Sequence, residues 1–400
     1  WGCLGSRPPL LLQFAVPSSP AMRLAPGFVT DSCGSDAFSV RFSPDGAFLA
    51  ASGAQGRVSI FNVSTGQEAY RLNIDEAETH PVKQLCWRPE REDATLRTRG
   101  VLAGASTDGK VRQWHVTSRR LLQTFGDPQD TGQLFCLDYA PDGRRLAAAG
   151  LTGELFVFDE ETKALTSRLK GGDSLTTAGH CSRVMALRFL QVPGNSDLIM
   201  SGGWDNTVQF WDVRAGSAVR AIFGPHICGD ALDITADGKV LLTGSWREEE
   251  QLELWDFGSG KRLETLPWRS LGSLQEPACS LYCARFSRDA SSSLIVAGGS
   301  LPNAGKGEAK VFAREAEGAP PKQAGGVAAS SGPCCAGTLP SFTCLSADVS
   351  PGDGSRVAFG GSDGRIRMMR LESSAAGGPE ERASVPIQPE TGNKGYPVGA

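Results

Sequence analysis

The chain has 400 residues, a formal net charge of −4, 49 glycines and 24 prolines. This near-balanced charge gives no basic surface of the kind that binds nucleic acid or acidic membranes, and no apolar run reaches the roughly 18–20 residues of a membrane-spanning helix. The glycine and proline content predicts many turns between short strands. The 11 cysteines are mostly scattered singly among apolar residues, which is typical of reduced, buried thiols in an intracellular protein.

The N-terminal segment, residues 1–30, contains the stretch RPPLLLQFAVPSSPA at 7–21, a short apolar run before small residues. This stretch resembles a weak signal peptide. We favour two other interpretations, namely an outer strand of the sheet system or non-native sequence ahead of a start at Met22. GFVTD at 27–31 is our candidate for a strand that closes the array of sheets.

A pattern of short strands and turns then recurs seven times. Each unit has an alternating apolar strand, a turn such as SPDG at 43–46, a strand rich in small residues such as FLAASGA at 48–54, a tight polar turn and another alternating strand. Most units add a fourth strand. In the first turn, proline presets φ, aspartate caps the turn and glycine takes the positive φ. The units begin near Phe38, Val82, Leu134, Val184, Asp230, Leu281 and Phe342.

Four antiparallel strands per unit make one propeller blade, so the sequence predicts an all-β, seven-bladed β-propeller over residues 31–371. The mean spacing of about 51 residues exceeds the ~40–45 usual for such repeats, and insertions explain the excess. The longest insertion, 314–340, is poor in bulky apolar residues and is expected to be flexible. The tail at 372–400 is expected to be disordered, with 384–388 as an alternative closing strand.

The repeats resemble those of the WD-repeat family of β-propellers over almost the whole chain. The fourth unit carries the family's full pattern, with His180, Ser201, Asp205, Trp211 and Asp212. The resemblance implies a hydrogen-bond chain in which Asp205 accepts from His180 and His180 accepts from the Ser201 hydroxyl. The Trp211 indole would donate to the same hydroxyl. Each buried polar atom then has a partner, so we expect these residues to hold the blade together rather than act as a nucleophile pair.

Trp204, Trp246 and Arg247 are the candidate partner-binding residues. The two tryptophans stand at the tight turns of consecutive units, SGGW and TGSW, and Arg247 follows the second. In propellers this turn lies on the rim of one face, where exposed Trp and Arg dominate interface energetics. The alternative is that each tryptophan only packs over a neighbouring blade. The connector GPHICGDALDI at 224–234 is a second candidate, for which an ordinary link between blades is the favoured interpretation.

Residues 199–214 also resemble the segment by which some WD-repeat proteins dock onto the DNA-damage-binding adaptor of cullin–RING ubiquitin ligases. Asp212 and Arg214 would form the docking pair. The alternative interpretation is an ion pair at the edge of the blade.

No catalytic set emerges from the sequence. The chain has 4 histidines and no nucleophile elbow, and GSGK at 258–261 lacks the first glycine and the hydroxyl residue of a phosphate-binding loop. Cys279 with Cys283, and Cys334 with Cys335, have no companion ligands at zinc spacing.

We therefore expect a non-catalytic scaffold that binds other proteins, with no cofactor, metal or nucleic acid, as a monomeric propeller within a complex. We expect it in the cytoplasm, and the sequence does not exclude the nucleus or the cilium. One alternative is a substrate receptor of a cullin–RING ligase that docks through Trp211-Asp212-x-Arg214. Another is an enzyme or a small-molecule sensor that uses the central channel.

Overall fold

The computed structural model describes residues 22–31, 34, 36–72, 80–90, 99–126, 132–171, 177–190, 197–268, 278–302, 306–314, 335–339, 343–352 and 354–373. The signal-like stretch 7–21, residues 315–334 of the insertion, and the tail from 374 onward with its segment 384–388 lie outside these residues. The described part of the chain contains strands and turns only, and so no helix that could cross a membrane.

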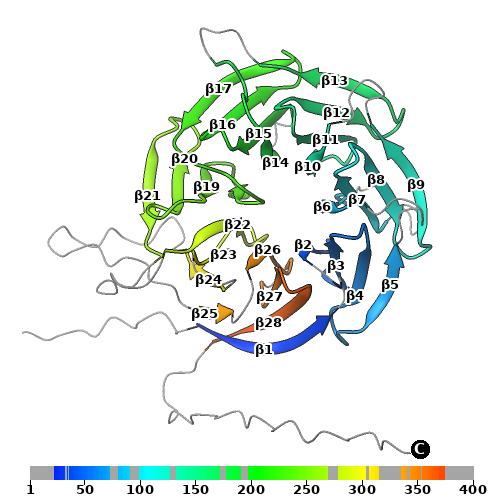
Figure 1. Cartoon of the computed structure of the whole chain (residues 1–400), viewed down its shortest axis with the longest axis vertical. Coiled ribbons are helices and arrows are strands. Elements are labelled where there is room, and N and C mark those ends of the chain that lie inside the picture. The colour runs from blue at the N-terminus through cyan, green and yellow to red at the C-terminus, as the bar shows by residue number, and fades with distance from the viewer. Residues whose placement is uncertain are drawn as a thin grey trace, which may run out of the picture. The chain divides into compact units, whose positions relative to one another are not determined.

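Seven four-stranded sheets form a ring around a central channel, which confirms the predicted seven-bladed propeller (Figure 1). In six blades the strands follow chain order from the channel outward. Blade one comprises β2 (Ala37–Phe42), β3 (Phe48–Gly53), β4 (Val58–Asn62) and β5 (Glu68–Leu72). Blade two comprises β6 (Val82–Trp87), β7 (Val101–Ser106), β8 (Val111–His115) and β9 (Arg120–Phe125). Blade three comprises β10 (Leu134–Tyr139), β11 (Arg145–Gly150), β12 (Leu155–Asp159) and β13 (Leu165–Leu169).

The next three blades repeat this arrangement. Blade four comprises β14 (Val184–Phe189), β15 (Leu198–Gly203), β16 (Thr207–Asp212) and β17 (Ser217–Phe223). Blade five comprises β18 (Leu232–Ile234), β19 (Val240–Gly244), β20 (Leu252–Asp256) and β21 (Arg262–Leu266). Blade six comprises β22 (Ser280–Phe286), β23 (Leu294–Ser300), β24 (Gly307–Ala313) and β25 (Cys335–Leu339). Residues 335–339 fall inside the predicted insertion, and there they form the outer strand of this blade.

The seventh blade contains both the first and the last strand of the ring. Its inner strands are β26 (Cys344–Val349), β27 (Arg356–Gly361) and β28 (Arg365–Ser373), and its outer strand is β1 (Met22–Asp31). GFVTD at 27–31, the candidate closing strand, belongs to β1, which is hydrogen-bonded to β28. The pairing holds the ring closed, because the first and last blades cannot separate without breaking these backbone hydrogen bonds.

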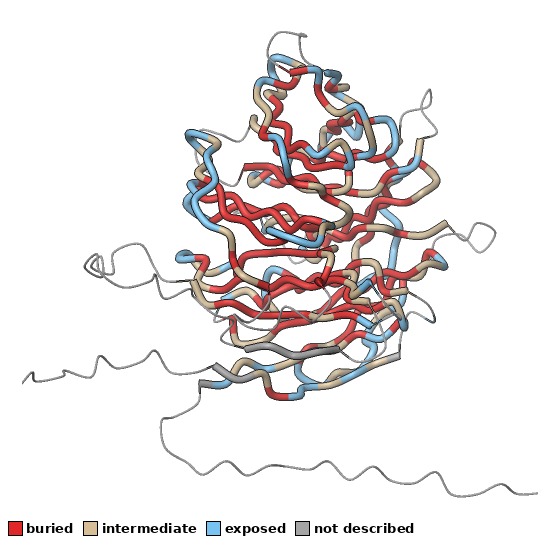
Figure 2. Tube along the Cα trace, turned by 60° about the vertical axis from the view of Figure 1, so that its left-hand side comes forward, coloured by how far each residue is buried: buried red, intermediate tan, exposed pale blue. Residues whose placement is uncertain are grey.

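The apolar core is divided among the seams between adjacent blades. Seven clusters of buried residues occur, one at each seam. At the seam of blades four and five, for example, Phe210 packs with Ile227 and Leu241. Figure 2 shows buried residues filling the interior of the propeller, while exposed residues lie mainly at its margins. Each blade is therefore stabilised mostly by its two neighbours.

The small residues of the second strands let adjacent blades approach closely, as the sequence predicted. A Cβ atom at Gly298 of blade six would lie 2.6 Å from the Sγ atom of Cys344 in blade seven. A Cβ atom at Gly244 of blade five would lie 2.9 Å from the Cβ atom of Ala284 in blade six. Side chains larger than hydrogen would force these seams apart.

Candidate functional site

The four residues assigned to the hydrogen-bond chain lie together inside blade four. His180 precedes β14, and its Nδ1 atom is 2.8 Å from the Oδ2 atom of Asp205 in the tight turn. The Nε2 atom of His180 is 2.7 Å from the Ser201 Oγ atom on β15. That oxygen also accepts a hydrogen bond of 2.8 Å from the Nε1 atom of Trp211 on β16. The geometry matches the chain that the resemblance implies.

The first hydrogen bond of this chain has a fixed direction. A carboxylate only accepts, so His180 donates to Asp205 through Nδ1, and its Nε2 atom bonds to the Ser201 hydroxyl. Burial raises the pKa of Asp205, but the hydrogen bond from His180, supported by Thr207 and the Cys181 N–H, outweighs burial and leaves the pKa lowered.

Ser201, His180 and Asp205 have the residue types of a hydrolytic triad, but their burial argues against that role. Ser201 is 0% exposed, and the side chains of His180 and Asp205 are 0% and 2% exposed. A substrate carbonyl could not reach the Ser201 hydroxyl without opening the blade. The arrangement therefore fixes β14, β15 and β16 to one another.

Trp204 and Trp246 flank a single histidine on the face that carries the tight turns of blades four and five. Their side chains remain substantially exposed, at 41% for Trp204 and 44% for Trp246. The ring centroid of His226 lies 6.4 Å from that of Trp204 and 6.5 Å from that of Trp246. We call these three residues the Trp patch.

Backbone and side-chain contacts fix the central histidine of the Trp patch. The Trp246 N–H donates to the His226 carbonyl at 2.9 Å, and the His226 Nδ1 atom is 2.6 Å from the Oδ1 atom of Asn206. Burial lowers the pKa of His226, although the nearby Asp205 carboxylate opposes this, so the ring is neutral at pH 7. At the edge of the patch, the guanidinium of Arg183 lies 4.6 Å from the Trp204 ring centroid.

Arg247, predicted to bind a partner together with the two tryptophans, turns back into its own loop. Its guanidinium donates twice to the Glu250 carbonyl, at 3.0 and 2.6 Å, and lies 2.6 Å from the Oε2 atom of Glu253. Its side chain is only 27% exposed. Sequence reasoning missed this because the partner carboxylate lies on β20, six residues after Arg247. The geometry gives Arg247 the role of bracing the loop.

Asp212 and Arg214 lie at the opposite end of β16 from Asp205, and so at the opposite edge of the blade. Arg214 is 74% exposed, with its NH2 atom 3.3 Å from Asp212 and its Nε atom 3.4 Å from Asp197. The hydrogen bond from Arg214 lowers the pKa of Asp212. The structure thus shows an exposed ion pair at the position of the predicted docking pair.

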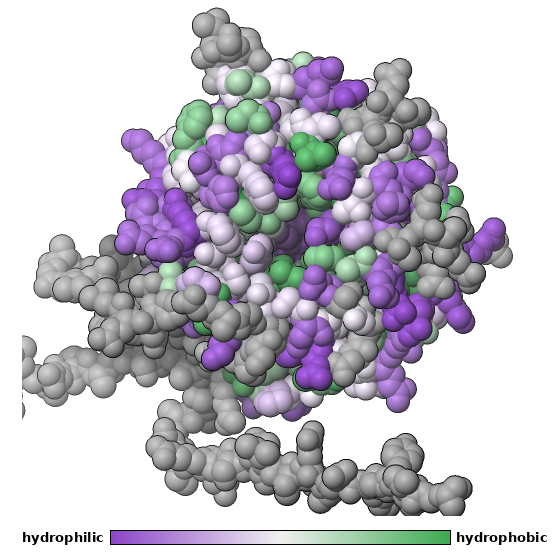
Figure 3. Space-filling view, viewed as in Figure 1, coloured by the Kyte–Doolittle hydropathy of each residue, from purple (hydrophilic) through white to green (hydrophobic). Residues whose placement is uncertain are grey.

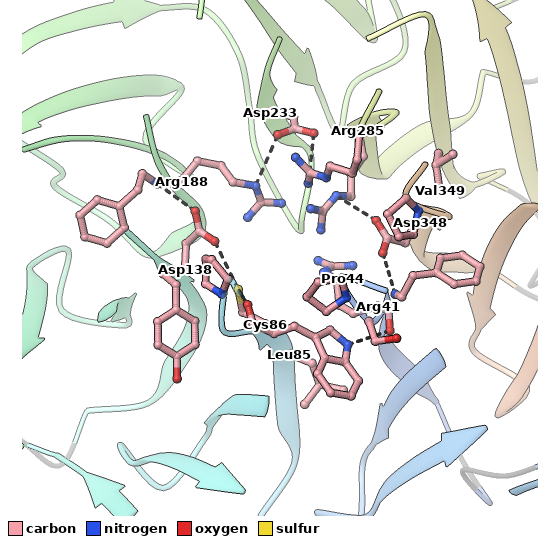
Figure 4. A pocket seen from close by; sticks show the side chains of 18 of the residues that line it. Arg41, Pro44, Leu85, Cys86, Asp138, Arg188, Asp233, Arg285, Asp348 and Val349 are labelled. Carbon is pink, nitrogen blue, oxygen red and sulfur yellow. Dashed lines mark hydrogen bonds and ion pairs between the residues drawn. The ribbon is translucent and has the colours of Figure 1, made fainter. Parts of the chain in front are cut away.

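The central channel contains a charged ring that the sequence analysis did not identify. In each blade, the second-to-last residue of the innermost strand lines one shared cavity of about 430 Å³ (Figure 4). Figure 3 shows the centre of the visible face hollowed and bordered by both hydrophilic and hydrophobic residues. We call this set the channel ring, and its seven members are Arg41, Cys86, Asp138, Arg188, Asp233, Arg285 and Asp348.

Asp230, in the connector before β18, joins three arginines of the channel ring. Arg41 of blade one and Arg188 of blade four each donate to its carboxylate, and the NH1 atom of Arg285 from blade six lies at 3.3 Å. Gln84 of blade two donates at 2.8 Å. Burial raises the pKa of Asp230, but the arginines outweigh it and the pKa is lowered. The connector that we interpreted as an ordinary link thus ties four other blades together.

The three aspartates of the channel ring each bond to the blade that follows. The Phe189 N–H donates to Asp138 at 2.9 Å, and equivalent backbone groups donate to Asp233 at 3.0 Å and to Asp348 at 2.9 Å. Burial raises the pKa of Asp138 and Asp348 despite these bonds and nearby arginines. A charged ligand entering the cavity would have to compete with existing ion pairs.

Two observations bear on metal or nucleophilic chemistry. Among the residues that the structure describes, no group of three His, Cys, Asp or Glu side chains could hold a metal ion. Burial, followed by the neighbouring Asp138 carboxylate, raises the pKa of the Cys86 thiol, which keeps it protonated.

The channel ring had a signal in the sequence: a charged residue recurs at the same position in the otherwise apolar first strand of most blades, as in VRF, LRF and ARF.

Comparison with known proteins identifies the repeats. The family model "WD domain, G-beta repeat" matches residues 29–62 and 172–212. The "Periodic tryptophan protein 2 homolog" of Dictyostelium discoideum is 28% identical over 182 residues, covering 45% of this chain and 18% of that protein. The "Poly(A)+ RNA export protein" of Schizosaccharomyces pombe is 24% identical over 174 residues, covering 43% of this chain and 44% of that protein.

A third relative is the "WD repeat-containing protein 1" of Xenopus tropicalis, 27% identical over 182 residues that cover 44% of this chain and 26% of that protein. The matches thus span less than half the length of each of these relatives. The seven-bladed ring, the hydrogen-bond chain of blade four and these matches all point to the same kind of repeat. Residues 29–62 and 172–212 are therefore identified as WD repeats, and the chain is similar to WD-repeat β-propellers.

Proposed function

We propose that this propeller is a non-catalytic scaffold that binds other proteins through the Trp patch on blades four and five. The observation that supports the proposal is the pairing of two half-exposed tryptophans, Trp204 and Trp246, around a histidine fixed by hydrogen bonds. Tryptophan is enriched among the residues that dominate binding energy, and a rigid aromatic side chain loses little entropy on binding.

The rest of the propeller is suited to hold this patch rigidly. The connector at 224–231 carries His226 on the face and Asp230 in the channel, where side chains from four blades converge on it. The patch therefore needs little reorganisation on binding, which favours affinity. We propose a monomeric propeller that acts inside the cell as part of a complex, in line with relatives named for RNA export and autophagy.

The test is affinity purification with quantitative mass spectrometry, comparing the wild type with a Trp204→Ala/Trp246→Ala variant. We expect the variant to lose a defined set of partners by at least tenfold while its thermal unfolding midpoint changes little. Leu121→Ala/Leu122→Ala is the matched control, because these apolar side chains are similarly exposed, at 46% and 49%, on another blade. Equal recovery of all partners by wild type and variant would reject this face as the interface.

A second candidate function is docking to a cullin–RING ligase adaptor through Asp212 and Arg214. The observation that favours it is the 74% exposure of the Arg214 side chain at the edge of blade four. Pull-down of purified adaptor by wild type and by Arg214→Ala tests this role. Loss of the adaptor signal in the variant would support docking, and equal signals would reject it.

A further inference from the structure

We propose that the Trp patch receives an arginine or lysine of the partner, which stacks on Trp246 and pairs with Glu248 and Glu249. The inference rests on the proposed function, because it names the chemistry of the partner that this same face would bind. Its basis is a difference between the two ends of the patch.

The two tryptophans of the patch differ in what covers their rings. The guanidinium of Arg183 already lies over Trp204, 4.6 Å from the ring centroid. Among the described residues no cation lies over Trp246, whose only aromatic neighbour is His226 at 6.5 Å. Tryptophan is the best aromatic acceptor for a cation, which it attracts within about 6 Å of the ring centroid. Trp246 is therefore the open position.

The loop that follows Trp246 carries negative charge close to it in the sequence. Glu248 and Glu249 come two and three residues after it, are exposed, and form no ion pair with any described residue. The next two carboxylates differ, because Arg262 NH1 lies 2.7 Å from Glu250 and 2.9 Å from Glu253. The loop thus has two carboxylates without a cation.

The conformation of this loop is fixed before any partner arrives. Arg247 holds the Glu250 carbonyl and the Glu253 carboxylate, as described above. Glu250 adopts a φ of 50°, a left-handed conformation that a non-glycine residue takes only when its surroundings impose it. Glu248 and Glu249 are consequently presented on a braced turn, which lowers the entropic cost of binding.

Charge selects the occupant of the patch. A basic side chain over Trp246 gains both the attraction of the indole and that of two carboxylates, whereas an acidic segment or a nucleic-acid phosphate would be repelled. Arg183 keeps a second cation away from Trp204. A basic partner segment should therefore contact Trp246 with its cation and leave Trp204 for apolar contact.

The experiment is a titration followed by fluorine NMR of the full chain labelled with 5-fluorotryptophan. The signals of Trp204 and Trp246 are assigned by their loss in Trp204→Phe and Trp246→Phe. The probes are acetyl-Gly-Arg-Gly-Arg-Gly-amide and the same peptide with glutamate in place of arginine. We expect the arginine peptide to shift mainly the Trp246 signal, and its Kd to rise at least tenfold in Glu248→Gln/Glu249→Gln. Glu161→Gln/Glu264→Gln, on other exposed positions, should leave the Kd within twofold.

Three results would overturn the inference: equal shifts from the glutamate peptide, a Trp204 shift as large as that of Trp246, or an unchanged Kd in Glu248→Gln/Glu249→Gln. The same glutamine variant separates this inference from the proposed function. If its partners are all retained in the purification while Trp204→Ala/Trp246→Ala loses them, the face is an interface but its partner is not basic there. If neither variant loses partners, both proposals fail.

Discussion

Blade four and the central channel both bury polar groups, but they pair them over very different sequence distances. In blade four, Asp205 is 25 residues from His180 and Trp211 is 10 residues from Ser201. In the channel, Arg41 and Asp230 are separated by 189 residues. The first network is complete within one blade. The second network forms only when the ring is closed. A variant of the channel therefore tests closure of the ring, whereas a variant of the blade-four hydrogen-bond chain tests the integrity of a single sheet.

The largest effect is expected from Asp230→Asn. This change removes a carboxylate shared by Arg41, Arg188 and Arg285, and breaking a buried ion pair typically costs about 3–5 kcal/mol. We expect a large decrease in the urea unfolding midpoint, followed by tryptophan fluorescence. Asp142→Asn is the control, because Asp142 accepts from the Arg144 N–H in an exposed turn and an asparagine can do the same. A midpoint for Asp230→Asn equal to that of the control would show that the channel contacts do not hold the ring together.

Trp211→Phe should have the next largest effect. The substitution removes the indole donor to Ser201 and leaves a small cavity at a side chain that is 0% exposed, for an expected loss of about 2–3 kcal/mol in the free energy of unfolding. Trp255→Phe in blade five removes a similar donor, the indole N–H that bonds to Thr243 at 2.9 Å. Among the described residues, no histidine extends that hydrogen bond in blade five. A smaller loss for Trp255→Phe would show that the blade-four network acts as a unit. Equal losses would mean that only the single hydrogen bond counts.

The same contrast explains how far the sequence could predict the structure. The seven units, the closing strand at 27–31 and the geometry of His180 with Ser201 could be predicted because each depends on residues within one unit or at one end of the chain. The role of Asp230 could not, because its partners are on other blades. Arg247 was predicted to face a partner, yet an arginine side chain is long enough to reach Glu253 on its own hairpin.

The two regions should also respond to pH with opposite sign. The folded-state pKa of Asp205 is lowered, so its stabilisation is complete above the unfolded value of 3.8 and is lost as the pH falls below it. The folded-state pKa of Asp138 is raised by burial, so its ionised form destabilises the fold, and this penalty disappears as the pH falls toward 3.8.

Asparagine variants at these two positions isolate this effect. We expect the stability advantage of wild type over Asp205→Asn to shrink below about pH 4, and its advantage over Asp138→Asn to grow as the pH falls toward that value. Urea midpoints at pH 7, 5.5, 4.5 and 3.5 measure both trends. Parallel trends in the two variants would indicate that the channel carboxylate is as well compensated as the one in blade four.

The smallest effect on stability is expected from Arg214→Ala. The ion pair of Arg214 with Asp212 and Asp197 is exposed, and exposed pairs of this kind contribute little because water and salt screen them. We expect no measurable change in the urea midpoint at physiological salt. A clear loss of stability would instead mean that Asp197, which also lies 2.6 Å from Arg145 of blade three, joins the outer parts of the two blades through Arg214. The double variant Arg145→Ala/Arg214→Ala distinguishes the cases, since a loss that differs from the sum of the single changes would reveal that coupling.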